Sequence, residues 1–370
     1  MSNKKSINLA LQGGGAHGAF TWGVLDAFLE DNRIDIEGIT ATSAGAMNAA
    51  VLAQGKALGG AEKARETLHD FWWTISRAGS IFSPVKRTPL EMMMALNPVM
   101  ESWALDQSLS FAAFDALSRT VSPYEFNPFD INPLRTIVEE AVDFETVHAC
   151  DCLKLFISAT NVKTNTAKIF RNKEVTTDVL MASAALPFLF QAVEIDGEHY
   201  WDGGYMGNPS LYPLFYETES RDIMIVHINP ITRGEVPKKA YEIQNRLNEI
   251  TFNASLLKEL RAIMFVKRLI EDDMLKDEYK NYYKDVLLHA IRTDNLMCDL
   301  SVASKFDTSW PFMKYLHNLG YTEAKDWLSQ NFDAIGNKTT VDIEEDYLLK
   351  SSPSLNKDRK QPQAHKKKAG

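Results

Sequence analysis

The sequence predicts an α/β fold, a sheet covered by helices, followed by a mainly helical C-terminal region. Strand-like and helix-like patterns alternate from residue 7 to about residue 230, which is typical of a sheet sandwiched between helices. Beyond residue 232 the apolar residues recur mostly at helical spacing. With 370 residues and 45% hydrophobic content, the chain is long enough to bury a large core.

Each element of the first part has its own pattern. Short apolar runs predict strands, and periodic apolar residues that follow small residues predict helices. The expected strands cover residues 7–11, 39–42, 155–160, 167–170 and 223–228. The expected helices cover residues 16–29, 44–54 and 61–77. Residues 192–201 predict a hairpin around an Asp-Gly turn, and its second strand runs into Asp202.

The segment 81–127 is irregular, because four prolines are interleaved with methionines and aromatic residues. Methionine packs adaptably against varied surfaces, so this segment is either a mobile cap over an apolar site or ordinary helical packing. Both interpretations stay open at this point.

Helical patterns dominate the C-terminal region. They predict helices at 238–251 and 254–274, a strand at 286–291, and two short helices of which the second begins at a Thr322 cap. From residue 349 the chain is polar and lysine-rich, which predicts a disordered basic tail. We therefore divide the chain into a domain at 1–232, a mainly helical extension at 233–348 and a tail at 349–370.

Composition excludes some classes of function. The formal net charge of −9 would repel nucleic-acid phosphates, so no nucleic acid is expected as a partner. The three cysteines do not make a disulfide framework, and free thiols are expected. No Cys/His set has zinc-ligand spacing, and no metal site is expected. We find no secretory leader and no apolar run long enough to span a bilayer, which predicts a cytoplasmic protein.

Two motifs lie where an expected strand runs into an expected helix. One is a glycine loop at 13–18 (GGGAHG), and the other is a serine turn at 41–45 (ATSAG). A serine on such a tight turn is presented to a substrate by its small neighbours. Backbone amides of the glycine loop, at the same edge of the sheet, could bind a developing oxyanion. Together the motifs predict acyl transfer with Ser43 as the nucleophile.

The serine hydroxyl needs a base within hydrogen-bond reach, and two designs are open. In a catalytic triad the base is a histidine that follows the acid in the chain. His227, His289 and His317 are available downstream, but none lies in a distinctive small-residue context. In a dyad the base is a carboxylate. Asp202 suits this role, because Gly203 and Gly204 follow it and let the backbone turn sharply beside a cleft.

The glycine loop, the serine turn and the Asp-Gly-Gly at 202–204 occur in an order and at separations that resemble the patatin-like phospholipases. A further run at 180–187 (LMASAALP) resembles the stretch that precedes the acid-bearing loop in that family. The resemblance covers residues 7 to 230. It implies a three-layer α/β/α sandwich with a mostly parallel sheet. It also implies a lipid acyl hydrolase, phospholipase A-like or lysophospholipase-like, that acts on a lipid or other acyl ester without a cofactor.

The resemblance also implies roles for the motif residues. Ser43 would attack the ester carbonyl, Asp202 would accept its proton, and an acyl-enzyme would form. The oxyanion hole would consist of amides of Gly13, Gly14 and Gly15. Supporting positions are Ala16, His17, Gly18, Gly45, Gly203 and Gly204.

Two positions depart from the family pattern. Ala41 replaces the first glycine of the serine motif, and His17 stands where Arg or Lys is usual. An unperturbed histidine titrates near pH ~6.5, so His17 either makes activity depend on pH or only makes a local contact.

Other interpretations stay open as well. A catalytically weak lipid-binding or membrane-docking protein could keep the same fold. A dinucleotide-binding protein would also carry Gly13, Gly15 and Gly18 after a strand, although no acidic residue ends the next strand. Basic residues between 357 and 368 could draw the tail to anionic headgroups and make the protein peripheral at membranes. The sequence leaves open the acyl ester, the position that is cleaved and the oligomeric state.

Overall fold

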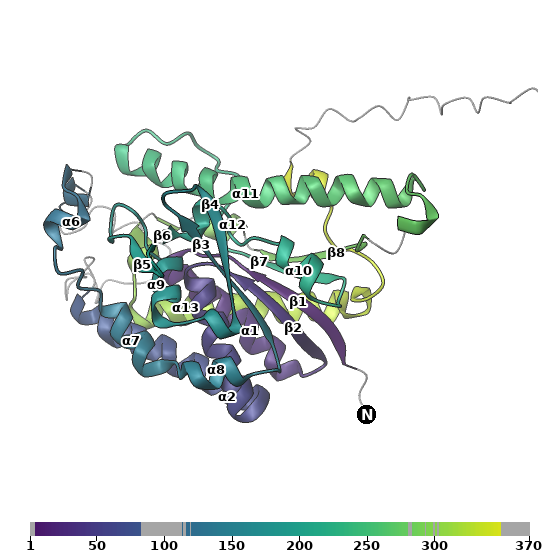
Figure 1. The fold of residues 1–370 in the computed structure, drawn as a ribbon, viewed down its shortest axis with the longest axis horizontal. Coiled ribbons are helices and arrows are strands. Elements are labelled where there is room, and N and C mark those ends of the chain that lie inside the picture. The colour runs from purple at the N-terminus through teal and green to yellow at the C-terminus, as the bar shows by residue number, and fades with distance from the viewer. Residues whose placement is uncertain are drawn as a thin grey trace, which may run out of the picture.

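The computed structural model describes residues 4–82, 113, 116–118, 120–279, 283–292, 294–298, 300–301 and 303–348. At its centre is an eight-stranded sheet with the order β5-β6-β3-β2-β1-β7-β8, and β4 also pairs with β3 (Figure 1). The strands are β1 (Lys5–Leu11), β2 (Ile34–Ala41), β3 (Lys154–Asn161), β4 (Thr166–Arg171), β5 (Val193–Ile195), β6 (Glu198–Asp202), β7 (Asp222–His227) and β8 (Leu287–Arg292). Strands β3, β2, β1, β7 and β8 run parallel to one another, while β4, β5 and β6 join antiparallel.

Helices cover both faces of this sheet and give the expected three layers (Figure 1). One layer contains α1 (Gly18–Asp31), α2 (Ala44–Phe82), α7 (Pro133–Ala141), α8 (Phe144–Ala149), α9 (Thr177–Ser183) and α13 (Trp310–Asn331). The opposite layer contains α10 (Tyr212–Glu217) and α11 (Ala240–Glu271). Short elements are α6 (Pro123–Phe126), α12 (Asp294–Cys298), a π-helical turn η7 (Ile343–Tyr347), and the 3-10 turns η1 (Gly15–His17), η2 (Asn172–Glu174), η3 (Gly203–Tyr205), η4 (Asp277–Tyr279), η5 (Ala303–Phe306) and η6 (Phe332–Ala334).

The two faces of the sheet belong to two different hydrophobic cores. In β1, Leu9 and Leu11 join the core beneath α1, α2 and α13, whereas Ala10 joins the core beneath α10 and α11. In β7, Val226 joins the core beneath α1, α2 and α13, and Ile225 joins the core beneath α10 and α11. Because side chains alternate along a strand and both faces are buried, the central strands are apolar throughout.

The C-terminal region belongs to the same sheet and the same cores. Strand β8 extends the sheet by pairing with β7 from Asp222↔Leu287 to His227↔Arg292. Helix α13 lies so close to α1 that a Cβ atom at Gly23 or at Gly320 would overlap the backbone of the other helix. The expected cap at 81–127 lies mostly outside the described residues, and the expected tail at 349–370 lies entirely outside them.

Some helix boundaries differ from those predicted. The two helices expected at 44–54 and 61–77 are joined in α2 across a kink at Gly59 and Gly60. The pair expected at 238–251 and 254–274 is one continuous helix, α11. The helix start expected at Thr322 is wrong, because Thr322 lies inside α13. That helix begins after Ser309 with a proline in its first turn, a favoured helix start.

The expectation of free thiols is wrong for two of the three cysteines. Cys150 and Cys152 form a disulfide after α8, and their Cα atoms are 5.2 Å apart, a normal separation for a bridge. Cys298 is not part of a disulfide, and its thiol donates to the Thr232 carbonyl at 2.9 Å. Among the helices described by the structure, none is long and apolar enough to cross a bilayer.

Candidate active site

The glycine loop and the serine turn leave the sheet side by side. They follow β1 and β2, which are parallel neighbours whose last residues, Leu11 and Ala41, are paired. The serine turn packs so closely against the end of β1 that a Cβ atom at Gly45 would lie 2.5 Å from the Leu11 carbonyl oxygen. Ser43 has a φ of 53°, a conformation that is costly for a residue other than glycine, and α2 begins at the next residue. This is the geometry of a nucleophile presented on a strained turn.

Asp202 reaches Ser43 from a different part of the sheet. It ends β6 and pairs with Ala159 of β3, two residues beyond the β3 residue that pairs with Ala41. The Ser43 hydroxyl lies close enough to the Asp202 carboxyl to favour its ionised form. The backbone then turns away at Gly203, where a Cβ atom would overlap the Ser158 carbonyl.

Burial changes the acidity of Asp202. Only 2% of the residue is exposed. Loss of hydration raises the pKa of Asp202 to about 7, although the Gly204 amide, 2.7 Å from Oδ1, and the Ser43 hydroxyl both act to lower it. A carboxyl with a pKa near neutral can take up and return a proton at neutral pH, as a general base must.

Backbone amides beside Ser43 are candidates for an oxyanion hole. The Gly13 amide is occupied, because it donates to Asn208 Oδ1 at 2.7 Å. This differs from the expectation that Gly13 is an oxyanion donor. Within the described part of the chain, the amides of Gly14 and Gly15 have no acceptor. The same is true of the Ala44 amide at the start of α2, which the sequence analysis did not single out.

His17 is buried and serves as a local structural contact. Its Nε2 is 2.8 Å from the Ser304 hydroxyl of η5. Burial, with a smaller effect from nearby Lys305, lowers the pKa of His17 to about 3. The ring is therefore neutral near pH 7. Of its neighbours, Ala16 borders the cavity described below, and Gly18 begins α1 against the Cβ atom of Ala44.

The three downstream histidines are engaged elsewhere. His289 is 2.9 Å from an Asp222 carboxyl oxygen, and His317 is 3.0 Å from an Asp26 carboxyl oxygen. His227 is buried in β7 with its ring against Tyr347. None of these contacts involves Ser43, so of these candidates the carboxyl of Asp202, and not an imidazole, lies beside the serine.

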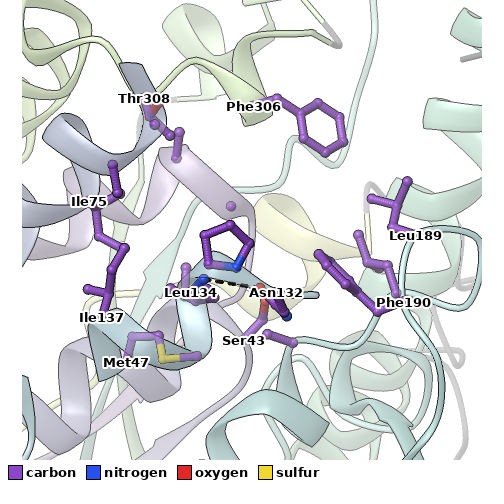
Figure 2. A pocket seen from close by; sticks show the side chains of 18 of the residues that line it. Ser43, Met47, Ile75, Asn132, Leu134, Ile137, Leu189, Phe190, Phe306 and Thr308 are labelled. Atoms are coloured by element: carbon purple, nitrogen blue, oxygen red, sulfur yellow. Dashed lines mark hydrogen bonds between the residues drawn. The ribbon is translucent and has the colours of Figure 1, made fainter. Parts of the chain in front are cut away.

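An apolar cavity of about 470 Å³ adjoins Ser43. Figure 2 shows Ser43 among side chains from α2, α7 and the segment after α9. Most of the lining side chains are aliphatic or aromatic, and they include Met47, Phe71, Trp72, Ile75, Phe126, Ile131, Leu134, Ile137, Leu186, Leu189, Phe190 and Phe306. Its volume is within the range of small-molecule sites, and its walls suit a flexible hydrocarbon chain.

A cation from the C-terminal region borders the same cavity. Lys305 of η5 lies against the glycine loop, and its ammonium is 3.3 Å from Asn245 Oδ1 and 4.0 Å from a Glu249 carboxyl oxygen. Burial lowers the pKa of Lys305. No sequence motif indicated Lys305, because it lies far along the chain from the glycine loop.

These observations define a class of protein: a three-layer α/β/α sandwich with a serine-centred site at the carboxyl edge of a mostly parallel sheet. The chain belongs to the patatin-like phospholipase family, whose model matches residues 9–215, more than half of the sequence. Members of this family are lipid hydrolases, and the family expected from the motifs is confirmed. The dinucleotide-binding alternative has no support from this assignment.

Two solved structures have a distant likeness to the chain. One is VipD from Legionella pneumophila, with 14% identity and a TM-score of 0.40, covering 89% of this chain and 67% of VipD. The other is the type III effector protein ExoU, with 15% identity and a TM-score of 0.32, covering 89% of this chain and 54% of ExoU. No curated protein matches the sequence. The family assignment therefore rests on the family model.

Proposed function

We propose that the protein hydrolyses carboxylic esters of lipids, in the manner of a phospholipase A or lysophospholipase, through a Ser43–Asp202 dyad. One observation carries the proposal: the hydroxyl of a strained serine meets a buried carboxyl next to an apolar cavity. In this proposal Asp202 accepts the serine proton, and the cavity holds an acyl chain.

The first half of the reaction forms an acyl-enzyme. The Ser43 Oγ atom attacks the ester carbonyl carbon while Asp202 takes up its proton. In this proposal the amides of Gly14, Gly15 and Ala44 donate to the resulting oxyanion. The bond from the carbonyl carbon to the alcohol oxygen then breaks, and the proton on Asp202 passes to the leaving alkoxide.

The second half releases the acid. Asp202, ionised again, takes a proton from a water molecule as its oxygen attacks the acyl carbon. When the tetrahedral intermediate collapses, the bond to Ser43 Oγ breaks and the proton on Asp202 returns to that oxygen. The products are a fatty acid and an alcohol such as a lysophospholipid, and no metal or cofactor takes part.

A test combines active-site labelling with product release. A fluorophosphonate probe should label the parent protein and leave Ser43→Ala unlabelled. Asp202→Asn should label far more slowly, because the amide cannot accept the serine proton. Against a panel of phospholipids, lysophospholipids and glycerides, only the parent should release fatty acid, and the panel then identifies the ester that is cleaved.

Asp196→Asn is the matched control for the change at Asp202. Asp196 is exposed in the turn before β6 with a φ of 53°, a conformation that asparagine also tolerates, so this variant should behave as the parent. A folded parent that neither labels nor hydrolyses any ester would contradict the proposal. That result would favour the catalytically weak lipid-binding alternative.

A further inference from the structure

Two segments near the cavity expose large apolar side chains. In the first segment, residues 121–133, Phe129 is 86% exposed and Ile131 is 67% exposed. In the second segment, residues 185–193, Phe188 is 56% exposed. We call Tyr124, Phe129, Ile131 and Phe188 the apolar rim. Folded proteins seldom leave several large apolar side chains exposed together without a binding partner.

The segments that carry the apolar rim also build the cavity wall. Phe126 and Leu134 line the cavity from the first segment and the helix that follows it, and Leu189 and Phe190 line it from the second (Figure 2 shows Leu134, Leu189 and Phe190). Ile131 both lines the cavity and is exposed, so the cavity meets the surface at the apolar rim.

Hydrogen bonds hold the apolar rim in place. The Asn127 side chain accepts from the Ile131 amide and donates to the Ile131 carbonyl, each at 3.0 Å, which fixes the turn that presents Phe129. The two segments are also tied to each other. Gln191 Nε2 donates to the Asn127 carbonyl at 2.9 Å, and the Tyr124 hydroxyl accepts from the Ala192 amide at 3.1 Å. The two segments that carry the apolar rim are therefore tied to each other beside the cavity.

The charge of these segments indicates what kind of surface they meet. Residues 121–133 and 185–193 contain no lysine or arginine, and their charged residues are Glu125 and Asp130. Contact with a strongly anionic surface would be repulsive, since anionic membranes attract basic residues. Apolar side chains that enter the interface of a zwitterionic lipid layer need no such attraction.

We propose that the apolar rim docks into the surface of a zwitterionic phospholipid layer, so that an acyl chain passes from the layer into the cavity without crossing water. The inference rests on the proposed function, because the lipid-hydrolase site gives the cavity its occupant. The driving force is burial of the exposed rim side chains, which is independent of salt. It differs from attraction through the basic tail, which salt would weaken.

The test measures binding to phosphatidylcholine vesicles by co-sedimentation, in the Ser43→Ala background so that no lipid is consumed. Phe129→Ser with Phe188→Ser should weaken binding at least about tenfold, the effect of losing more than about 1.4 kcal/mol of apolar burial. Raising the salt concentration should leave binding of the parent unchanged. Phe129→Trp, which keeps an aromatic ring suited to the interface, should retain binding.

Phe265→Ser is the matched control. Phe265 is 64% exposed on the C-terminal half of α11, at the end of the molecule opposite α6 (Figure 1), and its loss should not affect vesicle binding. Turnover of a water-soluble p-nitrophenyl ester by the rim variants with Ser43 intact should stay within about twofold of the parent, because a monomeric ester needs no docking surface.

The outcomes separate this inference from the proposed function. Unchanged vesicle binding in the double variant, with ester turnover intact, would overturn the docking surface and leave the hydrolase. Weakened binding in a protein that hydrolyses no ester would support docking and overturn the hydrolase. Binding that requires anionic lipid, is lost in high salt and disappears on removal of residues 349–370 would assign the contact to the tail and overturn the rim.

Discussion

At the scale of single residues, the acidity of Asp202 sets the expected pH dependence. Burial raises its pKa to about 7, and a general base acts only when ionised. We therefore expect kcat/KM for a soluble ester to fall about tenfold per pH unit below pH 7 and to level off above it. The pKa values of His17, about 3, and His227, about 4, are too low to contribute in this range. A profile that is flat from pH 5 to pH 8 would contradict the assignment of Asp202 as the base.

Glu259 provides the control for this measurement. Its burial in α11 raises its pKa to about 7 as well, while its Oε2 atom accepts from the backbone amides of Leu211 and Tyr212. Since Glu259 does not contact Ser43 or Asp202, Glu259→Gln should leave the midpoint of the pH profile unchanged. A midpoint that moves with Glu259 would show that this carboxyl, and not Asp202, is titrating.

The sequence could predict Ser43 and Asp202 as site candidates because each lies in a motif with a local backbone requirement. Ser43 needs small neighbours on a tight turn, and Asp202 needs glycines after a strand. Their roles stay predictions, but the structure brings both to one place. The sequence could not predict that the Gly13 amide donates to Asn208, or that His17 is neutral beside Ser304. Those states depend on partners that are distant in the chain.

At the scale of elements, η5 packs directly against the glycine loop. The Lys305 carbonyl oxygen would lie 2.5 Å from a Cβ atom at Gly15, and the φ of Gly15 is +60°. Gly15→Ala should therefore push the loop away from η5 and displace the amide that we propose as an oxyanion donor. We expect kcat to fall about 10²–10³-fold, as when one such donor is lost, with a smaller effect on KM.

A suitable control for Gly15→Ala has the same backbone conformation without the crowding. Gly336 has a φ of +81° and no atom within 4 Å of a Cβ position. Gly336→Ala should lower stability slightly, through strain alone, and leave kcat unchanged. If both variants lose activity in proportion to their stability, the glycine loop has no specific role in catalysis.

Helices and strands were predictable where the pattern of apolar residues determines them. They were less predictable where tertiary contacts determine them. The strands β1, β2, β3 and β7 follow from apolar runs that must be buried on both faces. The single span of α11 was not predictable, because Asn253, between the two expected helices, resembles a break. Spacing gave no signal for the Cys150–Cys152 bridge, since pairing depends on how the backbone turns after α8.

At the scale of the whole molecule, the residues beyond the family match complete the fold. Strand β7 begins after residue 215, β8 covers its outer edge, and α13 packs along α1. A chain that ends at residue 232 would expose the edge of β7 and the apolar face of α1. We expect it not to unfold cooperatively, whereas a chain that ends at residue 348 should keep the thermal transition of the full protein. Circular dichroism during heating distinguishes these outcomes.

A point substitution tests, without removing a segment, how much the stability of the fold depends on the C-terminal region. Leu316 of α13 is fully buried in the core that α13 shares with α1, so Leu316→Ala should lower the free energy of unfolding by about 2–5 kcal/mol in urea. Leu58 is exposed and provides the control, because Leu58→Ala should change the free energy of unfolding by less than about 0.5 kcal/mol. If the two variants are equally stable and the 1–232 chain folds cooperatively, the C-terminal region is an appendage. If they differ as expected, η5 and Lys305 are held beside the candidate site by a core to which α13, outside the family match, contributes.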